Sequence, residues 1–283
     1  MNSVEFRAAL GLAGLYALRM LGMFLILPVF AVYAGRMPGG ENHALVGLAF
    51  GAFGLTQALL QLPMGMWSDR VGRKPVIYLG LALFLVGSLI CAASNHIGWL
   101  ILGRAVQGAG AISAAVIALL ADLTREEHRT RAMAMIGGSI ATTFAVSLVL
   151  APKLADWIGL PGIFLLTAVL TLVALLAVRL HIPDPAITRF HSDAETSRAR
   201  LPAVLRDPQL LRLNYGVFAL HSAQMAMFTV LPLLFSQIGG LDLQNHWQVY
   251  LPLVLGSFVL MVPAIIYGKN GASSSACLSL QSR

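Results

Sequence analysis

The sequence predicts an all-α membrane protein that crosses the bilayer several times. Of its 283 residues, 58% are hydrophobic and only 11% are charged, whereas soluble domains carry about 25% charged residues. Apolar stretches of the length needed to span about 30 Å of hydrocarbon as a helix recur along the chain. None of these stretches shows the two-residue alternation of a membrane barrel strand, so each is predicted to be a helix.

Eight stretches meet this length requirement. The first is much longer than the roughly 7 to 15 apolar residues of a signal peptide and contains Arg19, so it is predicted to be a retained helix. The eight stretches are residues 8–34, 44–64, 76–94, 98–121, 132–151, 161–180, 213–237 and 247–267.

The basic residues predict the orientation in the membrane. Of the 19 Lys and Arg, Arg36 and Lys153 lie in loops on one side, Arg19 and Arg104 lie inside spans, and the other fifteen lie on the opposite side. Such an excess of basic residues is typical of cytoplasmic loops, so both termini are expected in the cytoplasm. Because the net charge of +7 is distributed over every inner loop, it does not indicate nucleic-acid binding.

The spans divide the chain into four parts. Residues 1–180 are predicted to form a six-helix bundle, residues 181–212 a polar cytoplasmic loop, and residues 213–268 two further helices. The Ser-rich residues 269–283 are expected to be a disordered tail.

An internal repeat indicates what the last two helices are. Residues 23–30 (MFLILPVF) resemble residues 227–234 (MFTVLPLL), and the Leu-Pro pair at 62–63 corresponds to the Val-Pro pair at 262–263. A second bundle that begins and is then cut off is therefore expected, with a frameshift or premature stop near Lys269. The alternative is a genuine eight-helix protein with a flexible end.

The loop between the second and third spans has the pattern of a structured turn. Gly65 allows another helix to approach closely, Gly72 suits a tight turn with positive φ, and Asp69 offers an acceptor to a cation or a helix N-terminus. Arg70, Arg73 and Lys74 could contact anionic headgroups, as in any inner loop.

This loop closely resembles the signature of the major facilitator superfamily, G-x-L-a-D-r-x-G-r-k, with Trp67 where the signature has Leu. The resemblance implies a gating role for Gly65, Asp69, Arg70, Gly72, Arg73 and Lys74. It also implies that Asp122 joins this network, and Arg73 or Arg131 could pair with it.

The fourth span contains a cation at membrane depth. An Arg there costs about 2.5 to 3.5 kcal/mol unless it faces a partner or a wet cavity. Gln107 lies one turn after Arg104 on the same face, while Gly103, Gly108 and Gly110 permit close helix packing. Snorkelling of Arg104 to the headgroups is the alternative. This segment resembles the fourth-helix pattern R-x-x-q-G-x-g of the same superfamily.

The resemblance is strongest to the drug:proton antiporter branch, in particular to bacterial inner-membrane multidrug or sugar efflux proteins. It implies twelve helices in two bundles, alternating access and proton-driven export of a small molecule. Ser147, Ala151, Pro152 and Ala155 only partly match the antiporter signature of the fifth helix, because small residues replace three of its glycines.

Polar residues within the spans are expected to line the pathway for substrate or protons. They are Arg19, Arg104, Gln107 and His221. No carboxylate lies deep in a span, so an anionic or neutral substrate is favoured over a cationic drug, although further helices could supply an acid. His221 could titrate near neutral pH, or it could simply be a hydrogen-bonded packing residue.

Motifs for enzymatic chemistry are absent from the sequence. There is no H-E-x-x-H, no G-x-x-x-x-G-K-[ST] and no G-x-S-x-G, so neither an enzyme nor a cofactor is expected. The histidine in Glu126-Glu127-His128 lacks metal-ligand spacing, so no metal site is expected. The expected partners are a small-molecule substrate, protons and the lipid bilayer. The alternative to a working transporter is a non-transporting fragment or an assembly partner of one.

Overall fold

A computed structural model of the chain describes residues 1–183, 206–242, 245–253, 255–257 and 259. These residues form helices and connecting turns without a strand, which confirms the all-α class. The helices are α1 (Ser3–Phe24), α2 (Phe30–Ala34), α3 (His43–Val71), α4 (Arg73–Ala92), α5 (Ile97–Ala109), α6 (Ser113–Leu123), α7 (Glu126–His181) and α9 (Pro208–Gln237).

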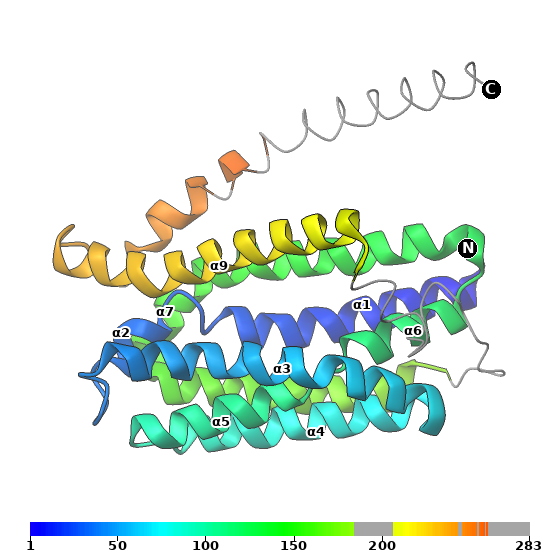
Figure 1. Ribbon diagram of the computed structural model, residues 1–283, viewed down its shortest axis with the longest axis horizontal. Coiled ribbons are helices and arrows are strands. Elements are labelled where there is room, and N and C mark those ends of the chain that lie inside the picture. The colour runs from blue at the N-terminus through cyan, green and yellow to red at the C-terminus, as the bar shows by residue number, and fades with distance from the viewer. Residues whose placement is uncertain (184–205, 243–244, 254, 258, 260–283) are drawn as a thin grey trace.

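The helices run roughly along one direction, so the molecule has two ends (Figure 1). We call them the Asp69 end, where α1 and α9 begin, and the Gly159 end, which carries α2 and the turn within α7. α9 lies beside the first arm of α7, and residues 247–253 begin a further helix after it (Figure 1).

Two predicted spans are each broken into two helices. The first breaks between α1 and α2, where Pro28 has no N–H to continue the helical hydrogen bonds. The fourth breaks at Gly110 between α5 and α6. A Cβ at Gly110 would lie 2.3 Å from the Gly80 carbonyl oxygen, so the chain at this break requires glycine.

The fifth and sixth predicted spans are the two arms of α7. Gly159, with φ 67° and ψ 179°, interrupts the helical conformation between them. The positive φ suits glycine, and Pro161 is favourable near the start of the second arm because the first helical N–H groups have no partner within the helix.

Five helical segments among the described residues are long and apolar enough to cross a membrane. They are His43–Val71, Arg73–Ala92, Ile97–Leu123, Glu126–His181 and Pro208–Ser236. The α1–α2 pair falls outside this set: α2 has only 5 residues, and α1, although 22 residues long, carries Glu5, Arg7 and Arg19. Most of the predicted span 247–267 lies outside the described residues.

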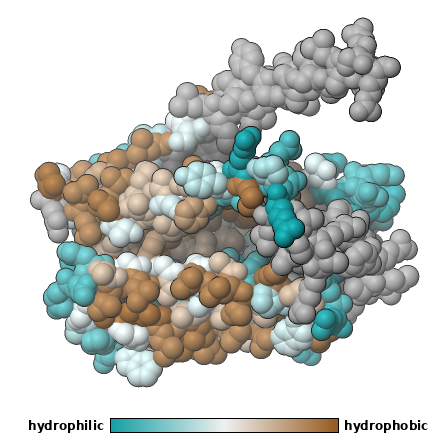
Figure 2. Space-filling view, in the orientation of Figure 1, coloured by the Kyte–Doolittle hydropathy of each residue, from teal (hydrophilic) through white to brown (hydrophobic). Residues whose placement is uncertain are grey.

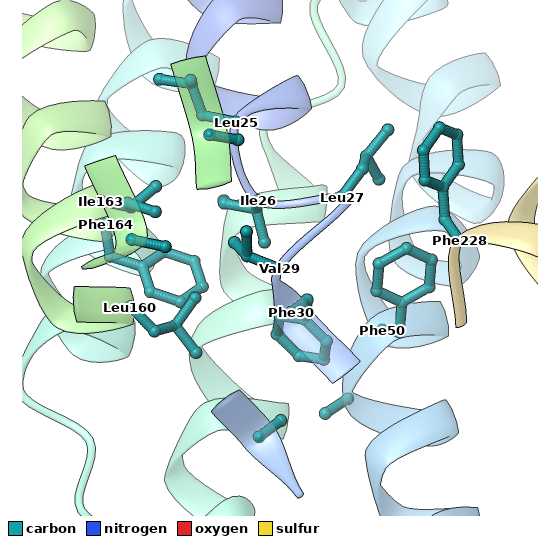
Figure 3. Close-up of a cluster of buried hydrophobic side chains, with 14 of the residues drawn as sticks. Leu25, Ile26, Leu27, Val29, Phe30, Phe50, Leu160, Ile163, Phe164 and Phe228 are labelled. Carbon is teal, nitrogen blue, oxygen red and sulfur yellow. The ribbon is translucent and has the colours of Figure 1, made fainter. Parts of the chain in front are cut away.

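The core consists of two clusters of apolar side chains. Figure 3 shows the cluster near the Gly159 end, where Ile26, Phe30 and Phe164 are fully buried and Phe228 of α9 contributes its ring. The second cluster lies nearer the Asp69 end and packs α1, α4 and α6 against the second arm of α7. Large apolar side chains such as Leu165, Leu172 and Phe218 remain exposed, as expected of helices that face lipid. Hydrophobic residues also cover much of the surface shown in Figure 2.

Candidate functional site

A buried ion network holds three helices together at the Asp69 end. Arg73 is only 2% exposed; its guanidinium contacts the Asp69 carboxylate, and its Nε lies 3.4 Å from Oδ2 of Asp122. Its Nη1 also donates to Ser68 Oγ at 3.0 Å, and Ser68 donates to the Gly65 carbonyl at 2.7 Å. Residues of α3, α4 and α6 therefore share one guanidinium.

Backbone geometry brings these groups together. Gly72 joins α3 to α4 with φ 104°, a conformation that L side chains rarely adopt. A Cβ on Gly65 would lie 3.1 Å from the Ala114 Cβ, so the glycine allows α3 to approach the start of α6. The turn and the close approach that the sequence predicts are both present.

The three basic residues of this loop have different surroundings. Arg73 lies in the network, not at the headgroups, and Lys74 Nζ donates to the Ile182 carbonyl at 2.6 Å. Arg70 is exposed, and Arg131 is also exposed, so the partner of Asp122 in the structure is Arg73. The gating role of these residues stays a prediction.

A second ionic contact at this end was not predicted from the sequence. Glu5 forms a capping box with Asn2 at the start of α1 and also accepts hydrogen bonds from Arg125, from Nε at 2.9 Å and from the backbone N at 3.1 Å. The side-chain hydrogen bond from Arg125 lowers the pKa of Glu5 to about 2. The capping box can be recognised in the sequence, but the partner 120 residues away cannot.

The polar residues of the fourth span form a buried chain of hydrogen bonds. Arg104 Nη1 donates to Gln107 Oε1 at 2.6 Å, Gln107 Nε2 donates to Ser88 Oγ at 2.8 Å, and Ser88 donates to the Phe84 carbonyl at 2.7 Å. Arg104 and Gln107 therefore lie together, as the sequence predicts. The part of Ser88 on α4 in this chain of hydrogen bonds was not predicted, because nothing in its local sequence distinguishes it.

Arg19 and Arg104 lie on either side of two aromatic rings. The guanidinium of Arg19 lies 5.4 Å from the Phe84 ring centroid, that of Arg104 lies 4.7 Å from the Phe53 centroid, and the two rings are 6.3 Å apart. Arg19 Nη2 donates to the Gly110 carbonyl at 3.0 Å, at the break between α5 and α6.

Neither arginine forms a salt bridge with a carboxylate in the part of the chain that the structure describes. Both arginines are only 2% exposed. Among the described residues, Arg19 Nε, Arg19 Nη1 and Arg104 Nε have no hydrogen-bond partner. Cation–π contacts thus supply part of the stabilisation that an ion pair would normally provide.

A shallow, open groove lies between α1 and the first arm of α7, and its volume is about 480 Å³. Figure 2 shows that this face of the molecule is hollowed along its middle. The lining residues are Leu10, Ala13, Gly14, Ala17, Met135 and Ser139.

This groove does not include the predicted pathway residues. At 100° per residue, Arg19 lies on the side of α1 opposite the groove-lining Leu10 and Ala17. Its guanidinium lies inside the bundle. His221 is exposed on α9, with Nδ1 2.8 Å from the Val217 carbonyl oxygen. The roles of Arg19, Arg104, Gln107 and His221 in transport stay predictions.

The glycines of the fourth span lie at close contacts between helices. A Cβ on Gly103 would lie 2.5 Å from Cys91 Sγ, and one on Gly108 would lie 2.1 Å from the Phe53 carbonyl oxygen. Together with Gly110 they let α5 approach α3 and α4, which supports the packing role expected of all three.

An all-helical chain with several membrane-crossing helices and buried polar networks between them has the features of a polytopic membrane transport protein. Residues 12–271 match the Major Facilitator Superfamily, and the chain belongs to this family.

Relatives agree with this assignment. The "Inner membrane transport protein YajR" of Escherichia coli (strain K12) is 44% identical over 271 residues, which are 95% of this chain and 59% of that protein. The "Uncharacterized transporter BU466" of Buchnera aphidicola subsp. Acyrthosiphon pisum is 38% identical over 271 residues, 95% of this chain and 69% of that protein. This chain therefore spans about three fifths of the length of the Escherichia coli relative.

Solved structures share the fold. A bacterial homolog of the human lysosomal transporter Spinster, in an inward-facing and occupied conformation, has a TM-score of 0.75 at 16% identity, with 92% of this chain and 61% of that chain covered. The human organic anion transporter MFSD10 has a TM-score of 0.64 at 19% identity, with 90% of this chain and 70% of that chain covered.

Proposed function

We propose that this protein is a secondary active transporter of the bacterial inner membrane that exports a small molecule in exchange for protons by alternating access. Both termini lie in the cytoplasm, so the Asp69 end is the cytoplasmic end. The observation that carries the proposal is the buried network in which Arg73 holds Asp69 and Asp122 at that end.

The network suits a gate because its parts come from different helices. The Arg73 and Asp122 side chains are 1% and 0% exposed, whereas that of Asp69 is 23% exposed. Asp69 can therefore also contact groups of a second bundle, for example the positive end of a helix, while Arg73 keeps its carboxylate oriented. Such a contact would favour the conformation in which the cytoplasmic end is closed.

The buried cations support an anionic or neutral amphipathic substrate. Arg19 and Arg104 have no carboxylate counter-ion among the described residues, and the groove between α1 and α7 is lined mainly by apolar side chains. One structural neighbour is the human organic anion transporter MFSD10, and an organic anion fits this substrate class.

Two more distant relatives support export. The "Multidrug resistance protein 2" of Bacillus subtilis is 33% identical over 128 residues, and the "Tetracycline resistance protein, class E" of Escherichia coli is 31% identical over 122 residues. Resistance to a drug is consistent with its removal from the cell, which supports the proposal that this chain belongs to the drug:proton antiporter branch.

The proposed organisation has residues 1–180 as the first bundle, residues 181–212 as a cytoplasmic connection and residues 213–268 as the start of a second bundle. Much of the connection, and all of the tail 269–283, lie outside the described residues.

The test is flux through proteoliposomes under an imposed pH gradient. We expect that Asp69→Asn reduces export of an organic anion strongly, whereas Glu127→Gln, the same loss of a carboxylate at an exposed residue outside the loop signature, leaves it nearly unchanged. Equal flux from Asp69→Asn and the unchanged protein would contradict the gating role. Flux that arises only when the remaining part of the Escherichia coli relative is co-expressed would support the alternative, an assembly partner.

A further inference from the structure

A group of aromatic side chains joins the last described helices to the first bundle at the Gly159 end. We call Phe144, Phe228, Phe235, His246 and Tyr250 the His246 cluster. Phe144 on α7 lies 6.0 Å from Phe228 on α9, and Phe228 lies 6.2 Å from Tyr250, as measured between ring centroids. The ring of His246 lies 5.4 Å from that of Phe235 and 6.3 Å from that of Tyr250.

His246 is buried within this cluster as a neutral ring. It is 0% exposed, and its Nε2 lies 3.3 Å from the Leu241 carbonyl oxygen. That oxygen can only accept, so Nε2 carries a hydrogen and Nδ1 is the atom with a free lone pair. His246 Nδ1 and the hydroxyl of Tyr250 have no hydrogen-bond partner in the described part of the chain.

A proton on Nδ1 of His246 would make the buried state of the ring less favourable. The imidazolium would be a second buried donor without an acceptor, and burial of a cation without a counter-ion is costly. Lys153 Nζ of α7 lies 5.0 Å from the ring centroid of the adjacent Trp247, and a cation cannot serve as the counter-ion of an imidazolium. Burial accordingly lowers the pKa of His246.

Other ionisable groups at this end come from several elements. α9 contributes the apolar ring of Phe235 to the contact with His246. The ionisable side chains at the Gly159 end are Asp242 and Tyr250 on the segment of His246, Lys153 and Asp156 on α7, Tyr33 on α2, Arg36 and Glu41 in the turns after α2, His43 at the start of α3 and His96 at the N-cap of α5.

We propose that His246 is a proton-binding site that controls the opening of the Gly159 end. With His246 neutral, the cluster packs α9 and residues 245–250 against the first arm of α7. With His246 protonated, the ring leaves the cluster and the Gly159 end opens. This inference rests on the proposed function, in which the Gly159 end faces outside and protons enter from there.

The proton then acts on the side from which it arrives. A proton from outside opens the outer end, where a transported molecule can leave. Loss of the proton lets the neutral ring pack again and closes that end. The sequence had suggested His221 for a titrating role, but that side chain is exposed on α9 and belongs to no buried cluster of the described residues.

The test measures the distance between α7 and α9 as a function of pH. Spin labels are attached at Trp157→Cys and Ile238→Cys, which are 83% and 80% exposed at this end, in a chain with Cys91→Ala and Cys277→Ser. Pulsed electron spin resonance is recorded in nanodiscs at about pH 8 and about pH 5, a range that brackets histidine titration. No substrate or gradient is present.

We expect one short distance at high pH and a second, longer distance at low pH. The ratio of the two populations should change by up to about tenfold per pH unit near the midpoint, because one proton is bound. His246→Phe, which preserves an aromatic ring, should remain in the short-distance state at both pH values. His221→Phe is the matched control and should keep the response of the unchanged chain.

A second readout covers the case in which His246→Phe does not fold. Trp67, Trp99 and Trp157 are all exposed and can be replaced by Phe, so that Trp247 alone reports on the neighbouring His246. The fluorescence emission of Trp247 should depend on pH in this chain. The same chain with His246→Gln should show no such pH dependence.

The inference is overturned if the unchanged chain shows one distance at both pH values, or if folded His246→Phe or His246→Gln still responds. Because neither readout involves flux, failure of this inference can be distinguished from failure of the proposed function. A pH response without transport would contradict the proposed function alone, whereas proton-driven transport with no response at His246 would contradict this inference alone.

Discussion

The guanidinium of Arg73 lies between the carboxylates of Asp69 and Asp122, so one cation from the start of α4 holds an acid from the end of α3 and an acid from the end of α6. Removal of the cation would leave the Asp122 side chain, which is 0% exposed, without this ion pair. Stability at this end therefore depends on Arg73 more than on its basic neighbours.

Arg73→Gln should lower the free energy of unfolding by about 3 to 5 kcal/mol, as expected when one partner of a buried ion pair is removed. Arg70→Gln, at an exposed site in the same turn, should change it by less than about 0.5 kcal/mol. Unfolding by sodium dodecyl sulfate in mixed micelles, followed by circular dichroism, measures both. Similar values for the two variants would show that the network contributes little.

The contact between Glu5 and Arg125 should make the start of α1 sensitive to acid. The pKa of Glu5 is lowered from 4.5 to about 2, so the contact stabilises the fold above the unfolded-state pKa and loses this effect as the pH falls toward 2. Hydrogen exchange at the first turns of α1 should therefore be slower in the unchanged chain than in Glu5→Gln at neutral pH. The two should converge in strong acid, and Glu127→Gln should behave like the unchanged chain throughout.

The hydrogen-bond chain from Arg104 through Gln107 to Ser88 predicts an effect for a small substitution. Ser88→Ala leaves the buried Gln107 amide without its acceptor, which costs about 1 to 3 kcal/mol. Ser94→Ala, just after the end of α4, removes a hydroxyl that bonds only to the Cys91 carbonyl among the described contacts and should cost less. Thermal unfolding in detergent compares the two, and an equal loss would show that the Gln107 contact has no special weight.

Two glycines should respond in opposite directions to alanine. Gly110→Ala places a Cβ 2.3 Å from the Gly80 carbonyl oxygen, so the α5–α6 break must shift and folded yield should fall sharply. Gly137 has open space around its Cβ position, so Gly137→Ala should stabilise α7 by about 0.5 to 1 kcal/mol. Size-exclusion profiles and melting temperatures of the two variants test this difference.

The orientation is open to a direct test. Reporter fusions after Leu180 and after Gly268 should both show a cytoplasmic signal, because fifteen of the 19 basic residues lie on that side of the predicted topology. A periplasmic signal from either fusion would reverse or break this topology, and the assignment of the Gly159 end to the outside would be wrong with it.

Hydropathy and local motifs determined a large part of this protein. An apolar stretch of membrane length must form a helix because no other open segment satisfies its backbone in lipid, so the helical class follows from composition alone. The turn at Gly72 and the close approach at Gly65 also follow from the sequence, since positive φ and missing Cβ atoms are local properties of glycine. Arg104 and Gln107 were expected together for a similar reason, their spacing on one helix.

The tertiary structure decided which distant groups meet. Arg73 rather than Arg131 pairs with Asp122, Arg125 reaches Glu5 across 120 residues, and Arg19 lies inside the bundle rather than in the groove. His246, next to a predicted span, is buried, whereas His221 is exposed. Helix periodicity shows which residues share a face, but the rotation of each helix and its neighbour on that face result from packing of all the helices together.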